Sequence, residues 1–226
     1  MNKTYFYYSL QTSIIIQILI GFIEIVTLFL HVPSTFNIIR QLLFLEVFVQ
    51  IIEGSFYVWL LYNFNVISNV TPKRYIDWFI TTPTMLITLI IYLIYLNNKD
   101  TVTPDRLEFF TVINDNFDNI VKVLLLNWSM LLFGYLGEEN IIPTLLGVIL
   151  GFIPFLIYYY IIFVNYVHFD NSGWKIFFYF LFFWSLYGIA ALFPYYIKNM
   201  FYNILDLFSK NFFGVFLIYL IFTKSY

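Results

Sequence analysis

The chain has 226 residues, of which 62% are hydrophobic, 24% are aromatic and only 11% are charged. Its mean hydropathy of +0.83 lies far above that of soluble domains and predicts an integral, multi-pass membrane protein that contacts the lipid bilayer. Eleven basic and 13 acidic residues leave a net charge of −2, so no positive field is available to bind nucleic acid. The absence of cysteine excludes disulfides, thiolate nucleophiles and cysteine-ligated metals.

The common motifs of enzymes are also missing from the sequence. There is no P-loop, no HExxH helix and no nucleophile elbow. The two histidines, His31 and His168, lie far apart in the chain and make a poor metal site. We therefore expect neither an enzyme nor a metal centre.

Seven apolar stretches are long enough to cross a bilayer, which takes about 20 residues of helix. In chain order they are residues 5–30, 36–64, 75–96, 120–137, 141–167, 174–197 and 201–222. The segment 97–119 between the third and fourth stretches is polar and charged, which predicts a solvated loop. No repeat or linker interrupts the chain, so we expect one domain over residues 1–226, an all-α bundle of seven transmembrane helices.

Basic residues near the span ends indicate the orientation, because they are commoner on the inner side. With the N-terminus outside, the inner side holds Arg40, Lys99, Arg106, Lys122, Lys175 and Lys224. The outer side then holds Lys3, Lys73 and Lys198. This bias predicts an outer N-terminus and an inner C-terminus.

Ionisable side chains at membrane depth cost a few kcal/mol or more, so they mark candidate functional positions. They are Glu24, Glu46, Glu53, Arg74, Asp77, Asp206 and Lys210. Lys210 lies too deep in the seventh span for its side chain to reach either interface. Asp206 is one helical turn earlier, where the two side chains meet. A pair that merely neutralises itself would explain this spacing equally well.

The third span carries a second polar stripe in "RYIDWFITTP", residues 74–83. Arg74, Asp77 and Thr81 are spaced i, i+3 and i+7, which places them on one face of a helix. Two carboxylates facing one buried cation suit the counterions of a protonated Schiff base, and a buried lysine can form such a base.

These motifs resemble those of microbial rhodopsins. "RYIDWFITTP" is similar to their third helix, and "LDLFSKNFFG", residues 205–214, is similar to their retinal-binding seventh helix. "FGYLGE", residues 133–138, resembles the fourth helix of proteorhodopsin-like members, and "WSLY", residues 184–187, resembles the sixth helix. The four matches occur in the expected order along the chain.

The resemblance implies that all-trans retinal is attached to Lys210. Asp77 would be the primary counterion and proton acceptor, Asp206 the second counterion, and Arg74 the gate toward the outer side. The implied retinal pocket comprises Trp78, Thr81, Met130, Gly134, Trp184 and Tyr187. Ordinary packing is the better explanation of each aromatic residue taken alone, and only their position within a matched motif favours Trp78 and Trp184 as pocket residues. Gly188, where the family pattern usually has proline, predicts a looser pocket near the retinal ring.

The choice between transport functions depends on the remaining polar residues. A fast outward proton pump needs an inner carboxylic acid as proton donor, and the position that the family pattern gives it holds Thr88. The second span instead carries Glu46, Gln50 and Glu53 on one face. A cation path along this stripe would comprise Glu24, Glu46, Gln50, Glu53, Asn203 and Asn211. These groups could also serve only to bond neighbouring helices.

The polar pattern of the second and third spans also resembles rhodopsins of giant viruses, and within them the group described as light-gated cation channels. We therefore predict a light-gated channel for cations, with a light-driven outward proton pump as the alternative and a sensory photoreceptor as a third reading. The moving species would be cations or protons. Whether the chain forms a homo-oligomer stays open, since lipid-facing and partner-facing surfaces are both apolar.

Overall fold

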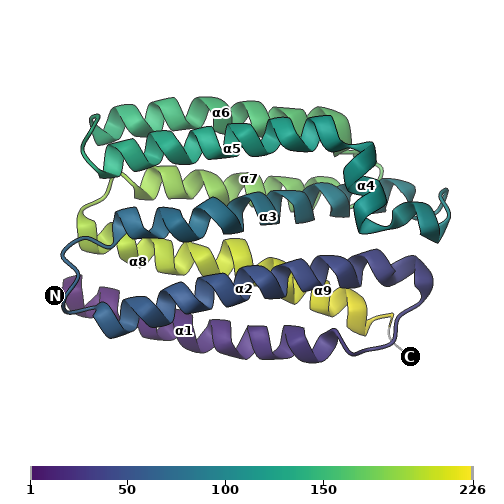
Figure 1. The fold of residues 1–226 in the computed structure, drawn as a ribbon, viewed down its shortest axis with the longest axis horizontal. Coiled ribbons are helices and arrows are strands. Elements are labelled where there is room, and N and C mark those ends of the chain that lie inside the picture. The colour runs from purple at the N-terminus through teal and green to yellow at the C-terminus, as the bar shows by residue number, and fades with distance from the viewer. Residues whose placement is uncertain (1, 225–226) are drawn as a thin grey trace.

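The computed structural model describes residues 2–224, and every regular element in that range is helical. Seven segments are long and apolar enough to cross a membrane, and Figure 1 shows them side by side, with the start of α1 and the end of α9 at opposite ends of the bundle. They are α1 (Asn2–Thr27), α2 (Asn37–Asn63), α3 (Thr71–Asn98), α5 (Phe117–Glu138), α6 (Thr144–Tyr166), α7 (Gly173–Ala190) and a seventh span formed by α8 (Tyr195–Asp206), the π-helical turn η3 (Leu207–Asn211) and α9 (Phe212–Phe222). The predicted all-helical, seven-span membrane fold is confirmed.

Prolines set two span boundaries that the sequence analysis misplaced. α3 begins at Thr71 with Pro72 in its first turn, four residues before the expected start at 75. α7 ends at Ala190 and α8 begins directly after Pro194, whereas the predicted sixth span continued to 197 and the seventh began at 201. Proline disfavours helix in the residue before it and suits the start of the next helix, so it separates the two spans.

The expectation of a solvated loop over residues 97–119 is wrong for most of that segment, which is helical. It contains the short helices η2 (Pro104–Leu107) and α4 (Phe109–Asp115), and α5 already begins at Phe117. Leu107 and Val112 are buried in the main apolar core, and the Phe109 N–H donates to Gln41 Oε1 over 3.1 Å. Apolar side chains hidden among the charges therefore fold this segment onto the bundle. One other short helix, η1 (Ser34–Phe36), leads into α2.

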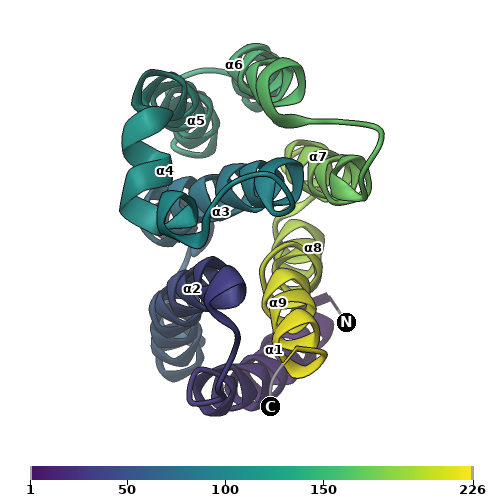
Figure 2. The same ribbon diagram turned by 90° about the vertical axis from the view of Figure 1, so that its right-hand side faces the viewer.

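α3 is the most buried of the seven spans, and Figure 2 shows it between α2, α5 and α7. Leu89, Ile90 and Leu93 of α3 lie in the main apolar core. α1 and α6 instead expose large apolar side chains such as Phe22 and Leu156, as expected for helices that face lipid. The central position of α3 lets its polar residues reach several other helices.

α5 and α6 approach closely because glycines line their contact. A Cβ atom added at Gly147 would lie 2.8 Å from the backbone oxygen of Phe133 and 3.2 Å from Cα of Gly137. A Cβ atom at Gly151 would lie 3.4 Å from the backbone oxygen of Met130. Small residues at such contacts allow membrane helices to pack backbone against backbone.

This packing predicts that Gly147→Ala destabilises the fold. The new methyl group would collide with a backbone oxygen that cannot move alone, at a cost of about 1–3 kcal/mol. Gly54→Ala is the matched control, because a Cβ atom there meets nothing within 4 Å and both positions lie inside helices. Thermal unfolding in detergent, followed by circular dichroism, should show a lower midpoint for Gly147→Ala alone. Equal midpoints for the two variants would contradict the close packing.

Candidate functional site

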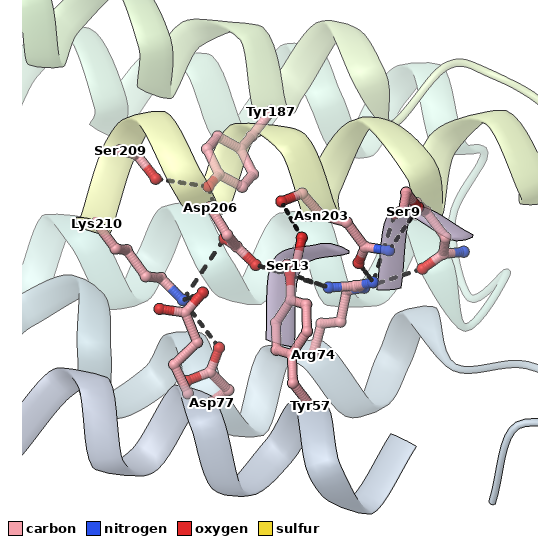
Figure 3. Close-up of polar contacts among 12 residues, drawn as sticks. Ser9, Ser13, Tyr57, Arg74, Asp77, Tyr187, Asn203, Asp206, Ser209 and Lys210 are labelled. Atoms are coloured by element: carbon pink, nitrogen blue, oxygen red, sulfur yellow. Dashed lines mark hydrogen bonds and ion pairs between the residues drawn. The ribbon is translucent and has the colours of Figure 1, made fainter. Parts of the chain in front are cut away.

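Lys210 lies buried in the middle of the bundle, on η3, where one π-helical turn joins α8 to α9. Such turns are rare and often mark functional positions. Its ammonium group donates a hydrogen bond to Asp77 Oδ2 over 3.0 Å and lies 3.5 Å from Asp206 Oδ1 (Figure 3). It also lies 3.6 Å from Glu53 Oε1. The structure thus brings together the lysine and the two aspartates that the motifs singled out, and it adds a third carboxylate.

Asp206 is the most completely bonded of these carboxylates. Its Oδ2 accepts a hydrogen bond from Tyr57 over 2.5 Å, and its Oδ1 accepts one from Tyr187 over 2.6 Å. Arg74 Nη1 lies 3.7 Å from Oδ2. Figure 3 shows Asp206 between Lys210 and Arg74. Nothing in the sequence distinguished Tyr57 from the other tyrosines of a chain that has 20.

Arg74 is fully buried and held by amide groups on the side of the site toward the N-terminal end of the bundle. Nη2 donates to Asn203 Oδ1 over 2.5 Å, and Nε donates to Asn199 Oδ1 over 2.9 Å. Asn203 is tied to α1 in turn, because its amide donates to Ser9 Oγ over 2.9 Å and its backbone oxygen accepts from Ser13 over 3.0 Å. The sequence analysis put Asn203 on the cation path. In the structure, Asn203 accepts a hydrogen bond from Arg74 and helps to hold it in place.

On the opposite side of Lys210, polar groups of α1, α2 and η3 meet. Glu53 is completely buried, and its Oε1 accepts from the Gln17 amide over 3.1 Å. Gln50 donates to the backbone oxygen of Gln17 over 2.7 Å and accepts from the Asn211 amide over 3.0 Å. The predicted partners Gln50, Glu53 and Asn211 thus lie together, with Gln17 as a member that the sequence analysis missed.

Two more buried acids continue this polar row toward the C-terminal end of the bundle. Glu46 is buried on α2, and its carboxyl group interacts with Thr88 of α3. The Glu24 carboxylate packs against Gly214 so closely that a Cβ atom there would collide with it. Glycine at this position therefore makes room for a carboxyl group inside the bundle.

The polar row contains acceptors that no donor of residues 2–224 satisfies. They are Gln17 Oε1, Glu24 Oε2, Glu46 Oε1, Glu53 Oε2, Asp77 Oδ1 and Asn211 Oδ1. Buried polar atoms in proteins are almost always bonded. Oxygen atoms of this kind can bond water, a transferable proton or a cation.

A mainly apolar cavity opens beside Lys210. Five of the six residues expected at a retinal pocket line it, namely Trp78, Met130, Gly134, Trp184 and Tyr187. The lining also includes residues that the sequence analysis did not select, among them Tyr75, Met85, Thr82 and Phe155. Thr81 does not line the cavity, and its hydroxyl group donates to the backbone oxygen of Asp77 over 3.0 Å.

Two glycines shape the walls of this cavity. A Cβ atom added at Gly134 would lie 2.6 Å from the Tyr75 hydroxyl oxygen, and one added at Gly188 would lie 2.6 Å from the Phe152 ring. The Phe152 ring therefore packs over the position where a looser pocket was expected. A lysine at one end, aromatic walls and small residues at close approaches suit an apolar molecule bonded to Lys210.

A separate buried ion pair joins α5 to α8 near the N-terminal end. Lys198 Nζ donates to both oxygens of Glu138, over 2.8 and 2.9 Å, and both side chains are largely buried. Lys198 was counted among the outer basic residues when the orientation was predicted, but it is paired inside the bundle. It is therefore a structural residue of this end rather than a free surface charge.

Comparison with known proteins gives consistent matches over nearly the whole chain. A family model described as "Bacteriorhodopsin-like protein" matches residues 8–224. The crystal structure of the viral rhodopsin OLPVRII is 26% identical with a TM-score of 0.83, covering 96% of this chain and 98% of that chain. Two further crystal structures share the fold. A blue light-absorbing proteorhodopsin from Med12 is 19% identical with a TM-score of 0.74, covering 97% of this chain and 98% of that chain. The rhodopsin of Exiguobacterium sibiricum is 17% identical with a TM-score of 0.77, covering 100% of this chain and 99% of that chain. No curated protein sequence matches the chain significantly.

The buried Glu138–Lys198 pair predicts a clear asymmetry between single and double substitutions. Lys198→Met should destabilise the protein by about 3–5 kcal/mol, because it leaves a buried carboxylate without its partner. Glu138→Leu combined with Lys198→Met should recover most of that loss. The exposed pair Lys99–Asp100, 3.6 Å apart, is the control, and Lys99→Met should cost at most about 1 kcal/mol. Thermal unfolding midpoints in detergent measure all three, and a harmless Lys198→Met would show that the pair contributes nothing.

Proposed function

Because the chain belongs to the bacteriorhodopsin-like family of microbial rhodopsins, whose members bind retinal, we propose that it is a light-gated cation channel with all-trans retinal on Lys210. The observation that carries this proposal is the row of buried acceptor oxygens without donors. The proposed orientation, an outer N-terminus and an inner C-terminus, follows from the basic residues at the span ends.

Lys210 has the surroundings that a chromophore-bearing lysine needs. It borders the aromatic cavity on one side and contacts Asp77 and Asp206 on the other. When bound, retinal supplies the absorption of visible light and a change of shape that the protein can use. Asp77 and Asp206 then balance the positive charge at the lysine nitrogen, and the cavity residues Trp78, Trp184 and Tyr187 hold the polyene.

The acidic residues of the polar row would provide a route that favours cations. Glu46 and Glu53 are seven residues apart on α2, so they lie about 10 Å apart along the helix axis. Gln50 lies between them and bonds Asn211. Acidic groups along a hydrated route attract cations and repel anions. One helical turn beyond Glu46, the buried Leu42 belongs to the apolar core, and in this proposal that core closes the route.

The outer half of the route is closed by Arg74. Its guanidinium group is fixed by the amides of Asn199 and Asn203 and by Asp206. A cation can pass only when these bonds loosen and the positive charge of Arg74 moves aside. The channel proposal therefore requires that light opens both this closure and the apolar one at the opposite end.

A light-driven outward proton pump is the second candidate, and the position of Glu46 favours it. Thr88 stands where a pump of this family carries its proton donor. Its hydroxyl group donates a hydrogen bond to the backbone oxygen of Thr84 over 3.0 Å. Glu46 of α2 is completely buried and interacts with Thr88. α2 can thus supply the carboxylic acid that α3 lacks.

Substitution of the lysine tests the chromophore assignment. Lys210→Ala should bind no retinal and show no visible absorbance, because the only amine bordering the cavity among its lining residues is removed. Lys175→Ala, which changes an exposed lysine, should form pigment normally. The measurement is the visible spectrum of membranes after retinal is added. Pigment formation by Lys210→Ala would overturn the attachment site.

Photocurrents under voltage clamp separate the channel from the pump. A channel gives currents that reverse sign with membrane voltage, and Glu46→Gln should reduce them several-fold, because it removes an acidic group from the row. Glu139→Gln is the matched control, since Glu139 is exposed. Currents of one direction at all voltages, abolished by Glu46→Gln, would establish the pump instead. The complete lack of light-dependent current would refute both.

A further inference from the structure

The buried charges around Lys210 would not cancel if every group were ionised. Three carboxylates lie within 4 Å of its ammonium nitrogen, those of Asp77, Asp206 and Glu53. Arg74, which contacts Asp206, is the second cation of the cluster. All five side chains are at least 97% buried. Three negative charges against two positive ones would leave a net charge deep in the membrane, at a large cost in free energy.

Asp206 is the carboxylate best suited to be ionised. Both of its oxygens accept short hydrogen bonds from tyrosine hydroxyl groups. The Tyr57 hydroxyl oxygen itself accepts from Arg74 over 3.3 Å, so its own proton points to Asp206. Hydrogen bonds of this kind, directed at a carboxylate, stabilise its charged form.

Asp77 is the next best placed to stay ionised. It lies nearest to the ammonium group and accepts a hydrogen bond from it over 3.0 Å. That contact is charge-assisted in both partners, and neutralising the carboxyl group would lose most of its strength.

Glu53 has the weakest support for a negative charge. Its Oε1 lies 3.6 Å from the Lys210 nitrogen, the longest of the three contacts, and its shortest hydrogen bond, over 3.1 Å, comes from the neutral amide of Gln17. Its Oε2 has no partner among the described residues, and neither has Gln17 Oε1. A carboxylic acid presents both a donor and an acceptor, as an amide does, so a proton on Glu53 supplies the donor that this pair of side chains lacks.

We propose that Glu53 is a third carboxyl group of the Lys210 centre and that it carries a proton in the dark. The five side chains then have zero net charge. One part of the inference rests on the proposed function. On that function, Glu53 is the member of the polar row nearest to Lys210, and its side chain stays neutral until this proton leaves.

Infrared spectroscopy of the purified protein without retinal tests the proposal directly. The band of a protonated carboxyl group should be present in the wild type and reduced in Glu53→Gln, whereas Asp77→Asn should leave it in place. Glu24→Gln and Glu46→Gln identify the bands of the other two buried acids. A spectrum that Glu53→Gln leaves unchanged would overturn the proposal. Since no retinal is needed, this result is independent of whether Lys210 bears the chromophore.

The visible spectrum of the pigment gives a second readout. Glu53→Gln replaces one neutral group by another of the same shape, so the absorption maximum should stay within a few nanometres of the wild type. Asp77→Asn removes a counterion and should shift it clearly to longer wavelength. A red shift of similar size in Glu53→Gln would show that Glu53 is charged and would overturn the proposal.

A third variant tests the proposal even if Glu53→Gln does not fold. Gln17→Leu keeps the carboxyl group and removes its amide partner, so the carboxyl band should move to higher frequency as its hydrogen bond is lost. A band that does not move would show that the proton lies elsewhere.

Discussion

The interaction on which the rest of the structure depends is the contact of one buried ammonium group with carboxylates from three helices. Lys210 on η3 is held by Asp77 of α3, Asp206 of α8 and Glu53 of α2. Neither the ammonium group nor the two aspartates could remain charged at this depth alone, because each would have to leave water without a partner. The cluster therefore ties the helices together at the middle of the bundle and fixes how they face one another.

The two halves of the bundle differ in how their polar groups are bonded. Toward the N-terminal end, Arg74 is anchored by Asn199 and Asn203, so its donors are met by acceptors. Toward the C-terminal end, the row that includes Glu46 and Asn211 has acceptor oxygens without donors. A region whose bonds are complete stays rigid, whereas a region of unmatched acceptors can exchange partners. The half that holds Arg74 is therefore the more completely bonded of the two, and on the proposed function it would be the closure and the other half the route.

The sequence predicted the seven-span fold and the pairing of Lys210 with Asp77 and Asp206, because polar residues in an apolar helix can be counted and their spacing defines one face. It did not predict Tyr57 or Gln17, since their positions follow from the rotation of α2 and α1 against the seventh span. The same rotation decides that Glu53 meets Lys210 itself. Helix rotation in lipid depends on packing between apolar faces, which hydropathy does not resolve.

On the proposed function, the kind of unmatched group also determines which ion the bundle would move. An orphan N–H group would attract anions, but the unmatched atoms of the row are oxygens. Oxygen acceptors near Glu24 and Glu46 bind species that bring positive charge, namely protons and cations. Arg74, the fixed cation, lies on the other side of Lys210 and opposes any leak of such species while its amide bonds hold. On the proposed function, the sign of the transported charge thus follows from the bonding of the two halves, whether the protein opens fully or only passes protons from one side to the other.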